Sequence, residues 1–267
     1  MFELFSYDFI IRAFLVGYAC AITAAILGNF LVAGRQAVTS DMLAHTSLAG
    51  VGLGVLFHIT PSITAALVAV LASLLLFFLS KQKTLPKEAI SVLILAGGIA
   101  IALLCVHLAK NNPIALENYL FGSILTVTPQ EVWMFLSLCC VVIGIMITFY
   151  NRFLCLMFDK DFFQSRFLYG GLFEMLLMIL VGIFVAFSLN IIGGLLMSSL
   201  LVIPVLTAQQ IGKSFRRSLF FSIGFNILGI TIGILSSFFF DIPASSAVVL
   251  SLIFIFIASF LFSKKGL

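Results

Sequence analysis

The sequence predicts an all-α membrane protein with eight or nine transmembrane helices. Of its 267 residues, 63% are hydrophobic and only 9% are charged, whereas a soluble domain carries charge on about a quarter of its residues. The mean hydropathy of the whole chain is +1.28. Nine apolar runs approach the roughly 20 helical residues that cross a bilayer. We therefore expect residues 1–267 to form a single transmembrane domain in the cytoplasmic membrane, with no separate soluble domain.

Short polar breaks separate the predicted spans in order along the chain. The first run ends at GRQAVTS, the second at HITP, the third at SKQKTLPKE and the fourth at KNNPIALEN. The longest break, YNRFLCLMFDKDFFQSR, follows the fifth run, and SLN, QQIGKSFRRS and DIP separate the last four runs. These breaks are rich in the residues that favour turns. The predicted spans are 9–33, 38–57, 61–79, 89–109, 131–150, 170–188, 191–209, 218–240 and 244–263.

Small residues inside the spans predict close helix packing. Gly50 and Gly54 are four residues apart, as are Gly229 and Gly233, and such pairs allow two helix backbones to approach each other. Pro204 lies within the seventh span, where it removes a backbone hydrogen bond and should kink the helix.

The cysteines predict no disulfide framework and no zinc knot. None of the five forms a CxxC pair, and all lie in or beside apolar runs, so we expect them to be small buried hydrophobic residues. They are Cys20, Cys105, Cys139, Cys140 and Cys155.

The positive charges predict which breaks face the cytoplasm. Lys and Arg concentrate on alternate breaks, and the positive-inside rule assigns those breaks to the cytoplasm. The C-terminus is then inside, and nine spans place the N-terminus outside; a re-entrant segment would reduce the count to eight. The 12 cytoplasmic residues, of 14 in all, are Arg35, Lys81, Lys83, Lys87, Arg152, Lys160, Arg166, Lys213, Arg216, Arg217, Lys264 and Lys265.

Asp41 and His45 are the strongest candidates for a functional site. They lie four residues apart in SDMLAHTSLAGVGLG, residues 40–54, and this spacing places both side chains on one face of a helix. A carboxylate and an imidazole are both metal ligands, and ionisable groups inside a membrane usually face a pathway or a partner. The alternative is a structural pair, in which Asp41 accepts a bond from His45 or caps its helix after Ser40.

Three other carboxylates can each be explained by a structural or solvated role as well as by a functional one. Glu117 and Asp241 are predicted on the outer side, where either could collect a cation at the extracytoplasmic entrance or remain a solvated loop residue. Glu174 lies near the cytoplasmic end of its span, and Arg166 on the same side is a plausible ion-pair partner.

The chain shows no means of hydrolysing ATP. The GxxxxGK[ST] signature is absent, as are HExxH and GxSxG. Two cytoplasmic segments are candidates for binding a partner protein. One is the basic segment TAQQIGKSFRRSL, residues 207–219, which has the pattern of a short helix; the other contains FDKDFFQS, residues 158–165. A short amphipathic helix can dock into a groove on a partner, although basic residues also serve simply to orient the chain.

Across nearly its whole length the chain resembles the permease subunits of zinc/manganese-type ABC importers. Three departures leave Asp41 and His45 in place: Ser40 stands where the family commonly has Gly, Ala44 where it has Ser, and Ala244 falls within the last motif. The matching segments are SDMLAHTSLAGVGLG, ENYLFGSILTVT (117–128), FDKDFFQS, IIGGLLMSSLLVIPVLTA (191–208), SFRRSL (214–219) and DIPASSAVV (241–249).

The resemblance implies the ABC importer permease fold and a homodimer around a central path. Separate ATPase chains would lie beneath the dimer, and an extracytoplasmic binding protein would deliver the metal. The subunit would be neither an enzyme nor a nucleic-acid binder, and would hold no permanent cofactor. Asp41 and His45 of each copy would form the transient metal site. The implied ATPase-coupling residues are Ser214, Phe215, Arg216 and Arg217, with Phe158, Asp159 and Asp161 as a second contact.

The metal and the mechanism leave alternatives open. Imidazole and carboxylate suit zinc but also manganese or iron; we expect zinc, because TSLAGVGLG and the short outer loops resemble the zinc-type members. An ion-coupled secondary carrier would also use intramembrane Asp and His, and would work without an ATPase. An intramembrane metalloenzyme would need a third ligand and a general base, for which the sequence offers no compact set.

Overall fold

Within the described residues, nine helices are long enough to span a membrane, which is one of the two counts that the sequence allows. The computed structural model describes residues 8–81, 86–109, 122, 127–158, 163, 170–212 and 214–263, and it contains no strand within them. All nine are apolar enough to cross a bilayer. They are α1 (Asp8–Ala33), α2 (Val38–Phe57), α3 (Pro61–Ser80), α4 (Lys87–Leu108), α6 (Pro129–Thr148), α9 (Gly170–Ile192), α10 (Gly194–Ile211), α11 (Phe215–Phe240) and α12 (Ala244–Ser263).

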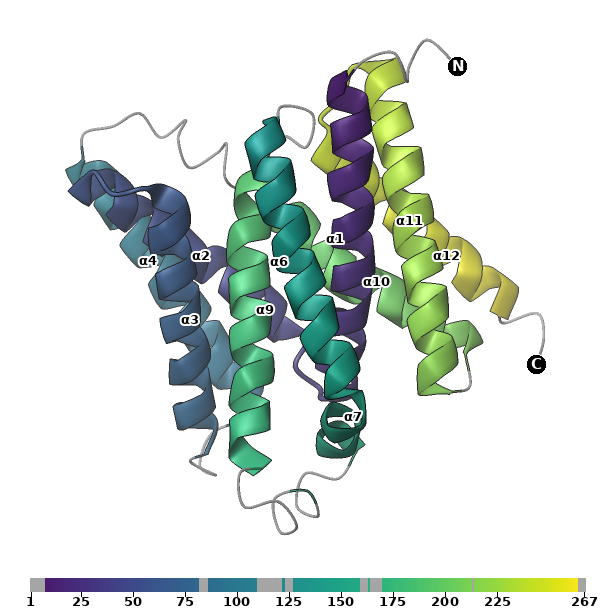
Figure 1. Cartoon of the computed structure of the whole chain (residues 1–267), viewed down its shortest axis with the longest axis horizontal. Helices are drawn as coiled ribbons and strands as arrows, with labels where there is room; N and C mark the ends of the chain where they lie inside the picture. The colour runs from purple at the N-terminus through teal and green to yellow at the C-terminus, as the bar shows by residue number, and fades with distance from the viewer. Residues whose placement is uncertain are drawn as a thin grey trace.

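Consecutive membrane helices alternate in direction (Figure 1). The breaks after α1, α3, α6 and α10 therefore all lie at one end of the molecule, the end that also holds the short helix α7 (Tyr150–Phe158). These are the breaks rich in Lys and Arg, so this end is the cytoplasmic one by the positive-inside rule. Helices α2, α10 and α12 cross obliquely behind the more upright α9, α6, α1 and α11.

Local sequence explains where several helices begin. Thr128 caps α6 in a capping box: its hydroxyl accepts from the Glu131 N–H at 3.4 Å, while its own N–H donates to Glu131 Oε2 at 2.9 Å. Pro61 opens α3 in the first turn, where its missing N–H costs nothing. Gly193, with φ of 91°, separates α9 from α10 in a conformation that favours glycine.

The basic segment 207–219 is not a separate short helix, contrary to expectation. Its first part completes α10, which ends at Ile211, and its last part begins α11, with Ser214 as the N-cap. The break between them is only a few residues long because Gly212 adopts an extended conformation. The short cytoplasmic helix is α7 instead, which buries Phe153 and Leu156 on one face.

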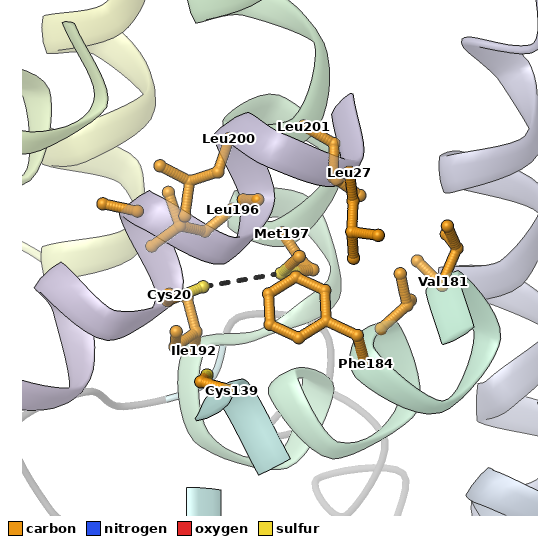
Figure 2. Close-up of a cluster of buried hydrophobic side chains, with 14 of the residues drawn as sticks. Cys20, Leu27, Cys139, Val181, Phe184, Ile192, Leu196, Met197, Leu200 and Leu201 are labelled. Atoms are coloured by element: carbon orange, nitrogen blue, oxygen red, sulfur yellow. Dashed lines mark hydrogen bonds between the residues drawn. The ribbon is translucent and has the colours of Figure 1, made fainter. Parts of the chain in front are cut away.

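The core lies where α1, α6, α9 and α10 meet (Figure 2). Cys20 of α1 is fully buried and its thiol donates to the Met197 sulfur of α10 at 3.8 Å. Cys105 and Cys139 are also buried, and all five cysteines are free thiols. The prediction of buried hydrophobic cysteines is thus confirmed for these three, whereas Cys140 is exposed on α6.

Asn226 binds three helices together at the proline of α10. Pro204 has no N–H, so the Leu200 carbonyl loses its partner within the helix. The Asn226 side chain of α11, fully buried, donates to that carbonyl at 3.1 Å and to the Ala21 carbonyl of α1 at 3.0 Å. The backbone hydrogen bond that α10 lacks at Pro204 is therefore replaced by one from a neighbouring helix.

Replacing Asn226 by leucine should lower the unfolding temperature of the protein in detergent. The change keeps the number and branching of the side-chain heavy atoms but leaves a buried carbonyl without its donor, which costs about 1–3 kcal/mol. Ser137→Ala is the matched control, because the Ser137 hydroxyl is exposed and bonds only within its own helix, to Met134 O. Equal unfolding temperatures for Asn226→Leu and the wild type would show that Asn226 does not hold α10.

Candidate metal site and cytoplasmic contacts

Asp41 and His45 lie in the first two turns of α2. The helix begins at Val38 without a side-chain cap, and the Ser40 hydroxyl donates to Ala37 O at 2.7 Å. Asp41 is therefore not the cap; it lies in the first turn, where a carboxylate is stabilised by the helix dipole. With a rise of about 1.5 Å per residue, the two side chains lie about 6 Å apart along the helix axis, on one face. The pair is thus near the cytoplasmic end of α2.

The opposite face of α2 is buried against other helices. A Cβ on Gly50 would lie 2.5 Å from Thr64 O of α3, and one on Gly98 of α4 would lie 2.8 Å from Thr46 Cα. The first of the predicted glycine pairs therefore serves packing. In contrast, Asp41 is exposed and His45 is partly exposed in the single chain. A face that carries a carboxylate is not suited to lipid, so it needs an aqueous path or another protein surface.

Neither side chain has a polar partner within the described part of the chain. No hydrogen bond or ion pair joins Asp41 to His45, and the one ion pair found among the described residues is elsewhere, between Lys87 and Glu174. The alternative of a satisfied structural pair therefore has no support from the contacts of α2.

The described part of one chain supplies too few ligands for a stable metal site. Among the described residues, no group of three or more His, Cys, Asp and Glu side chains is close enough to hold a metal ion. Protein zinc sites usually have three or four protein ligands. Asp41 and His45 would thus supply two of the ligands of such a site, and the described residues offer no third ligand of the kind that a metalloenzyme would need.

Two serines of α10 are additional polar candidates that the sequence analysis did not single out. A Cβ on Gly194, at the start of α10, would lie 3.7 Å from the Ala44 Cβ, so α10 begins beside the Asp41–His45 turn of α2. Ser198 and Ser199 follow one turn later and are partly exposed. Their hydroxyls donate to Leu195 O of their own helix at 3.3 and 2.9 Å, which leaves oxygen lone pairs available. The signal in the sequence is the pair of serines after Gly193 and Gly194.

The two cytoplasmic contact segments meet in space. Phe158, at the end of α7, and Phe215, at the start of α11, have ring centroids 6.2 Å apart. Phe215 also packs against Phe30 of α1 at 5.1 Å and Tyr150 of α7 at 6.3 Å. We call these four rings the aromatic cluster. It packs the first turn of α11 against α7, so Phe158, the described residue of the second predicted contact, lies on the same surface as the first.

The polar residues of that surface differ in their surroundings. Ser214 accepts from the Arg217 N–H at 3.5 Å and thereby begins α11. Arg216 and Arg217 are both exposed, and Phe158 is 69% exposed. Asp159 and Asp161 lie outside the described residues.

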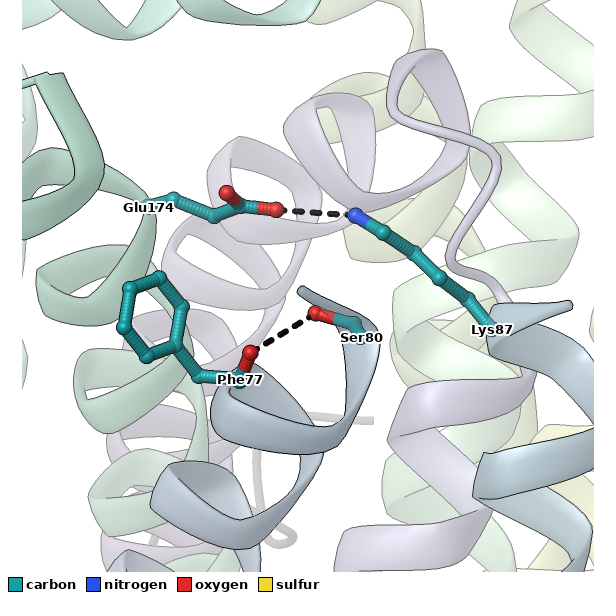
Figure 3. Close-up of polar contacts among 4 residues, drawn as sticks. All are labelled: Phe77, Ser80, Lys87 and Glu174. Carbon is teal, nitrogen blue, oxygen red and sulfur yellow. Dashed lines mark hydrogen bonds and ion pairs between the residues drawn. The ribbon is translucent and has the colours of Figure 1, made fainter. Parts of the chain in front are cut away.

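The structure describes two of the three other carboxylates named from the sequence, Asp241 and Glu174, which lie at the end of α11 and within α9. Asp241 is exposed and ends α11 with φ of 53°, at the outer end of the helix. Glu117 lies outside the described residues. Glu174 is only 5% exposed in its side chain, and its carboxylate pairs with Lys87 of α4 at 2.8 Å (Figure 3). The expected partner, Arg166, lies outside the described residues, so the ion pair with Lys87 is an additional link between α4 and α9.

Named membrane proteins of metal transport systems are similar to this chain over nearly its whole length. The high-affinity zinc uptake system membrane protein ZnuB of Buchnera aphidicola is 27% identical over 91% of this chain and 94% of that protein. The manganese transport system membrane protein MntC of Listeria monocytogenes is 24% identical over 98% of this chain and 93% of that protein.

Solved structures agree on the fold. PsaBC from Streptococcus pneumoniae, solved in complex with a Fab, superimposes with a TM-score of 0.84 at 21% identity, over 96% of this chain and 92% of that chain. The sequence pattern of the family described as "ABC 3 transport family" matches residues 6–263. The chain therefore belongs to the ABC 3 transport family.

Proposed function

We propose that the protein is the membrane-spanning permease subunit of an ATP-driven importer of divalent metal, with Zn²⁺ as the substrate. The observation that carries the proposal is the Asp41–His45 pair: two metal-ligating side chains on one face of α2, without a polar partner among the described residues. The names of the zinc and manganese relatives support metal as the substrate class. Manganese or iron in the same kind of system is the second candidate.

Two copies of the chain complete the metal site in this proposal. Each copy contributes one carboxylate and one imidazole, which gives four ligands of the kind that zinc and manganese accept. The exposed side of α2 in the single chain is the surface where the copies meet, which removes the carboxylate from lipid. A transported ion must also leave its site, so a site shared between two movable subunits suits transport better than a rigid cage.

Separate subunits supply the energy and the metal. The chain has no nucleotide-binding signature, so an ABC ATPase on another chain binds the surface around the aromatic cluster. The proposed contact residues there are Ser214, Phe215, Arg216, Arg217 and Phe158, with Asp159 and Asp161. An extracytoplasmic binding protein delivers the metal at the opposite end, near Asp241 and Glu117.

Reconstitution into liposomes tests the proposed function. The permease, its ATPase and its binding protein should together accumulate Zn²⁺ only when ATP is present on the ATPase side. Uptake by the permease alone, driven by an ion gradient, would instead identify a secondary carrier. Competition with Mn²⁺ and Fe²⁺ in the same assay decides the metal: if excess Zn²⁺ left Mn²⁺ uptake unchanged, zinc would be the wrong substrate.

Arg217→Glu should reduce co-purification of the ATPase with the permease. Arg217 is exposed at the start of α11, beside the aromatic cluster, and reversing its charge replaces attraction by repulsion at the same position. Arg35→Glu is the matched control, because Arg35 is an exposed arginine in the turn between α1 and α2, at the same end of the molecule. The ATPase recovered per permease should fall for Arg217→Glu and remain unchanged for Arg35→Glu. Equal recovery of the ATPase with both variants would mean that the basic segment serves only to orient the chain in the membrane.

A further inference from the structure

A groove of about 560 Å³ lies at the cytoplasmic end of the molecule, between α1, α6, α7 and α11. Its inner walls are apolar and consist of Ile26, Met146, Ile147 and Phe220, among others. Ile26 lies seven residues before the end of α1, about 10 Å deeper along the helix than the end itself. Ile147 and Phe220 are 68% and 73% exposed. The walls therefore lie at the depth of acyl chains and are open to them from the side.

The mouth of the same groove presents hydrogen-bond donors and a positive charge. Arg216 and Asn151, both exposed, line it at the beginnings of α11 and α7. Tyr150 also lines it, and the Tyr150 hydroxyl is buried without a hydrogen-bond partner among the described residues. No ion pair to Arg216 is present in the described part of the chain. None of the described residues that line the groove is a carboxylate. The mouth is therefore suited to an anion.

The two adjacent arginines of the SFRRS segment differ in their relation to the groove. Arg216 lines the groove, whereas Arg217 does not. Arg216 thus lies next to apolar walls that continue into the bilayer. A soluble ATPase can contact the guanidinium but cannot contact walls that lie within the bilayer. A molecule with a phosphate at one end and hydrocarbon at the other fits both parts.

We propose that this groove binds one anionic phospholipid of the cytoplasmic leaflet. The guanidinium of Arg216 and the side-chain amide of Asn151 hold the lipid phosphate, and an acyl chain lies along Met146, Ile147 and Phe220. Arginine binds phosphate through paired, charge-assisted hydrogen bonds, and basic pockets between membrane helices on the cytoplasmic side are suited to acidic headgroups. The lipid would link α11 to α6 and α7 at the end where the aromatic cluster lies. The inference does not depend on the transported substrate.

Native mass spectrometry of the purified, delipidated permease tests the proposal, with phosphatidylglycerol as the added probe. Arg216→Gln should weaken retention of one phosphatidylglycerol by about tenfold or more, because it removes a charge-assisted hydrogen bond to the lipid phosphate. Arg217→Gln is the matched control: it removes the same charge one residue away, outside the groove, and should retain the lipid as the wild type does. Ile147→Trp, which fills the groove but keeps Arg216, should also weaken retention.

Other outcomes would overturn the proposal in distinct ways. Equal loss of lipid in Arg216→Gln and Arg217→Gln would indicate only a diffuse effect of positive charge. Equal retention of phosphatidylcholine and phosphatidylglycerol would remove the preference for an anionic lipid. Displacement of the lipid by inorganic phosphate alone would show that the groove recognises a phosphate ion and not a phospholipid. Normal lipid retention by Arg216→Gln would show that Arg216 does not hold the lipid phosphate; if that variant also lost ATPase co-purification, the ATPase contact would be the role left to Arg216. All the lipid measurements use the permease without its ATPase, so failure of the transport proposal would not affect them.

Discussion

Alanine at Asp41 or His45 should abolish metal uptake while the protein still folds and still binds its ATPase. Each substitution removes one ligand type from both copies of a shared site. We therefore expect metal uptake to fall by more than the roughly 10–100-fold that is typical when a residue hydrogen-bonded to a metal ligand is removed. Folding should survive because Asp41 is exposed, His45 is partly exposed, and neither is bonded to another described residue. Removing them leaves no buried group unpaired.

The measurement is ATP-dependent uptake of radioactive ⁶⁵Zn²⁺ in liposomes, with ATPase co-purification followed in parallel. His107→Ala is the matched control, because His107 is an exposed histidine of another membrane helix, in the last turn of α4. It should transport normally. Normal transport by His45→Ala would show that the site assignment is wrong. Loss of transport together with loss of the folded protein would point to a structural pair.

Gly28→Leu should prevent the protein from folding. Gly28 is buried in α1, five residues before the end of the helix, and a Cβ at this position would overlap the carbonyl oxygen of Leu201 and lie 2.9 Å from its carbonyl carbon. The obstacle is the backbone of α10, which cannot rotate away as a side chain can. Even a single added methyl group should cost about 1–3 kcal/mol or more, and leucine adds three further carbon atoms. We expect little monodisperse protein after solubilisation, and a markedly lower unfolding temperature for Gly28→Ala.

Gly144→Ala is the matched control for this prediction. Gly144 lies within α6, and nothing lies within 4 Å of a Cβ built there. Replacing glycine by alanine inside a helix is favourable by roughly 0.5–1 kcal/mol when space permits, so this variant should unfold at the wild-type temperature or slightly above it. Similar unfolding of Gly28→Ala and the wild type would mean that α1 and α10 can separate without loss of stability.

The spans could be predicted from the sequence because apolar length is a strong local signal. The second and last predicted spans coincide with α2 and α12, and the remaining ends differ by a few residues. The sixth span was predicted to end at 188, whereas α9 continues to Ile192. The polar side chains of this break are accommodated within the helix, where Ser188 donates to Phe184 O and Asn190 donates to Ser62 of α3. The helix therefore ends at the glycine pair Gly193–Gly194 and not at Ser188–Asn190.

Contacts between distant segments could not be predicted in this way. The Lys87–Glu174 ion pair joins residues that are 87 positions apart, and no periodicity in either span indicates the other. The meeting of Phe158 with Phe215 likewise depends on how α7 packs beside α11. The sequence analysis named both segments as partner contacts for separate reasons, and it could not show that they form one surface.

The candidate site was predictable in its residues but not in its surroundings. The spacing of Asp41 and His45 defines a common helix face, and the start of α2 at Val38 now places that face near the cytoplasmic end of the helix. Whether Asp41 and His45 have hydrogen-bond partners within the chain depends on the neighbouring helices, and the periodicity of the sequence does not identify those helices. The three-dimensional structure supplies this answer: the other face of α2 packs against small residues of α3 and α4, and the pair itself has no polar partner among the described residues.

Equilibrium Zn²⁺ binding to the purified protein, with the number of ions per chain determined together with the molecular mass, tests the shared site most directly. If Asp41 and His45 of two copies form it, the protein should bind about one ion per two chains, because a four-ligand site needs both copies. Asp41→Ala and His45→Ala should each abolish that binding, and His107→Ala should preserve it. One ion per chain in a monomer, or unchanged binding by His45→Ala, would contradict the account.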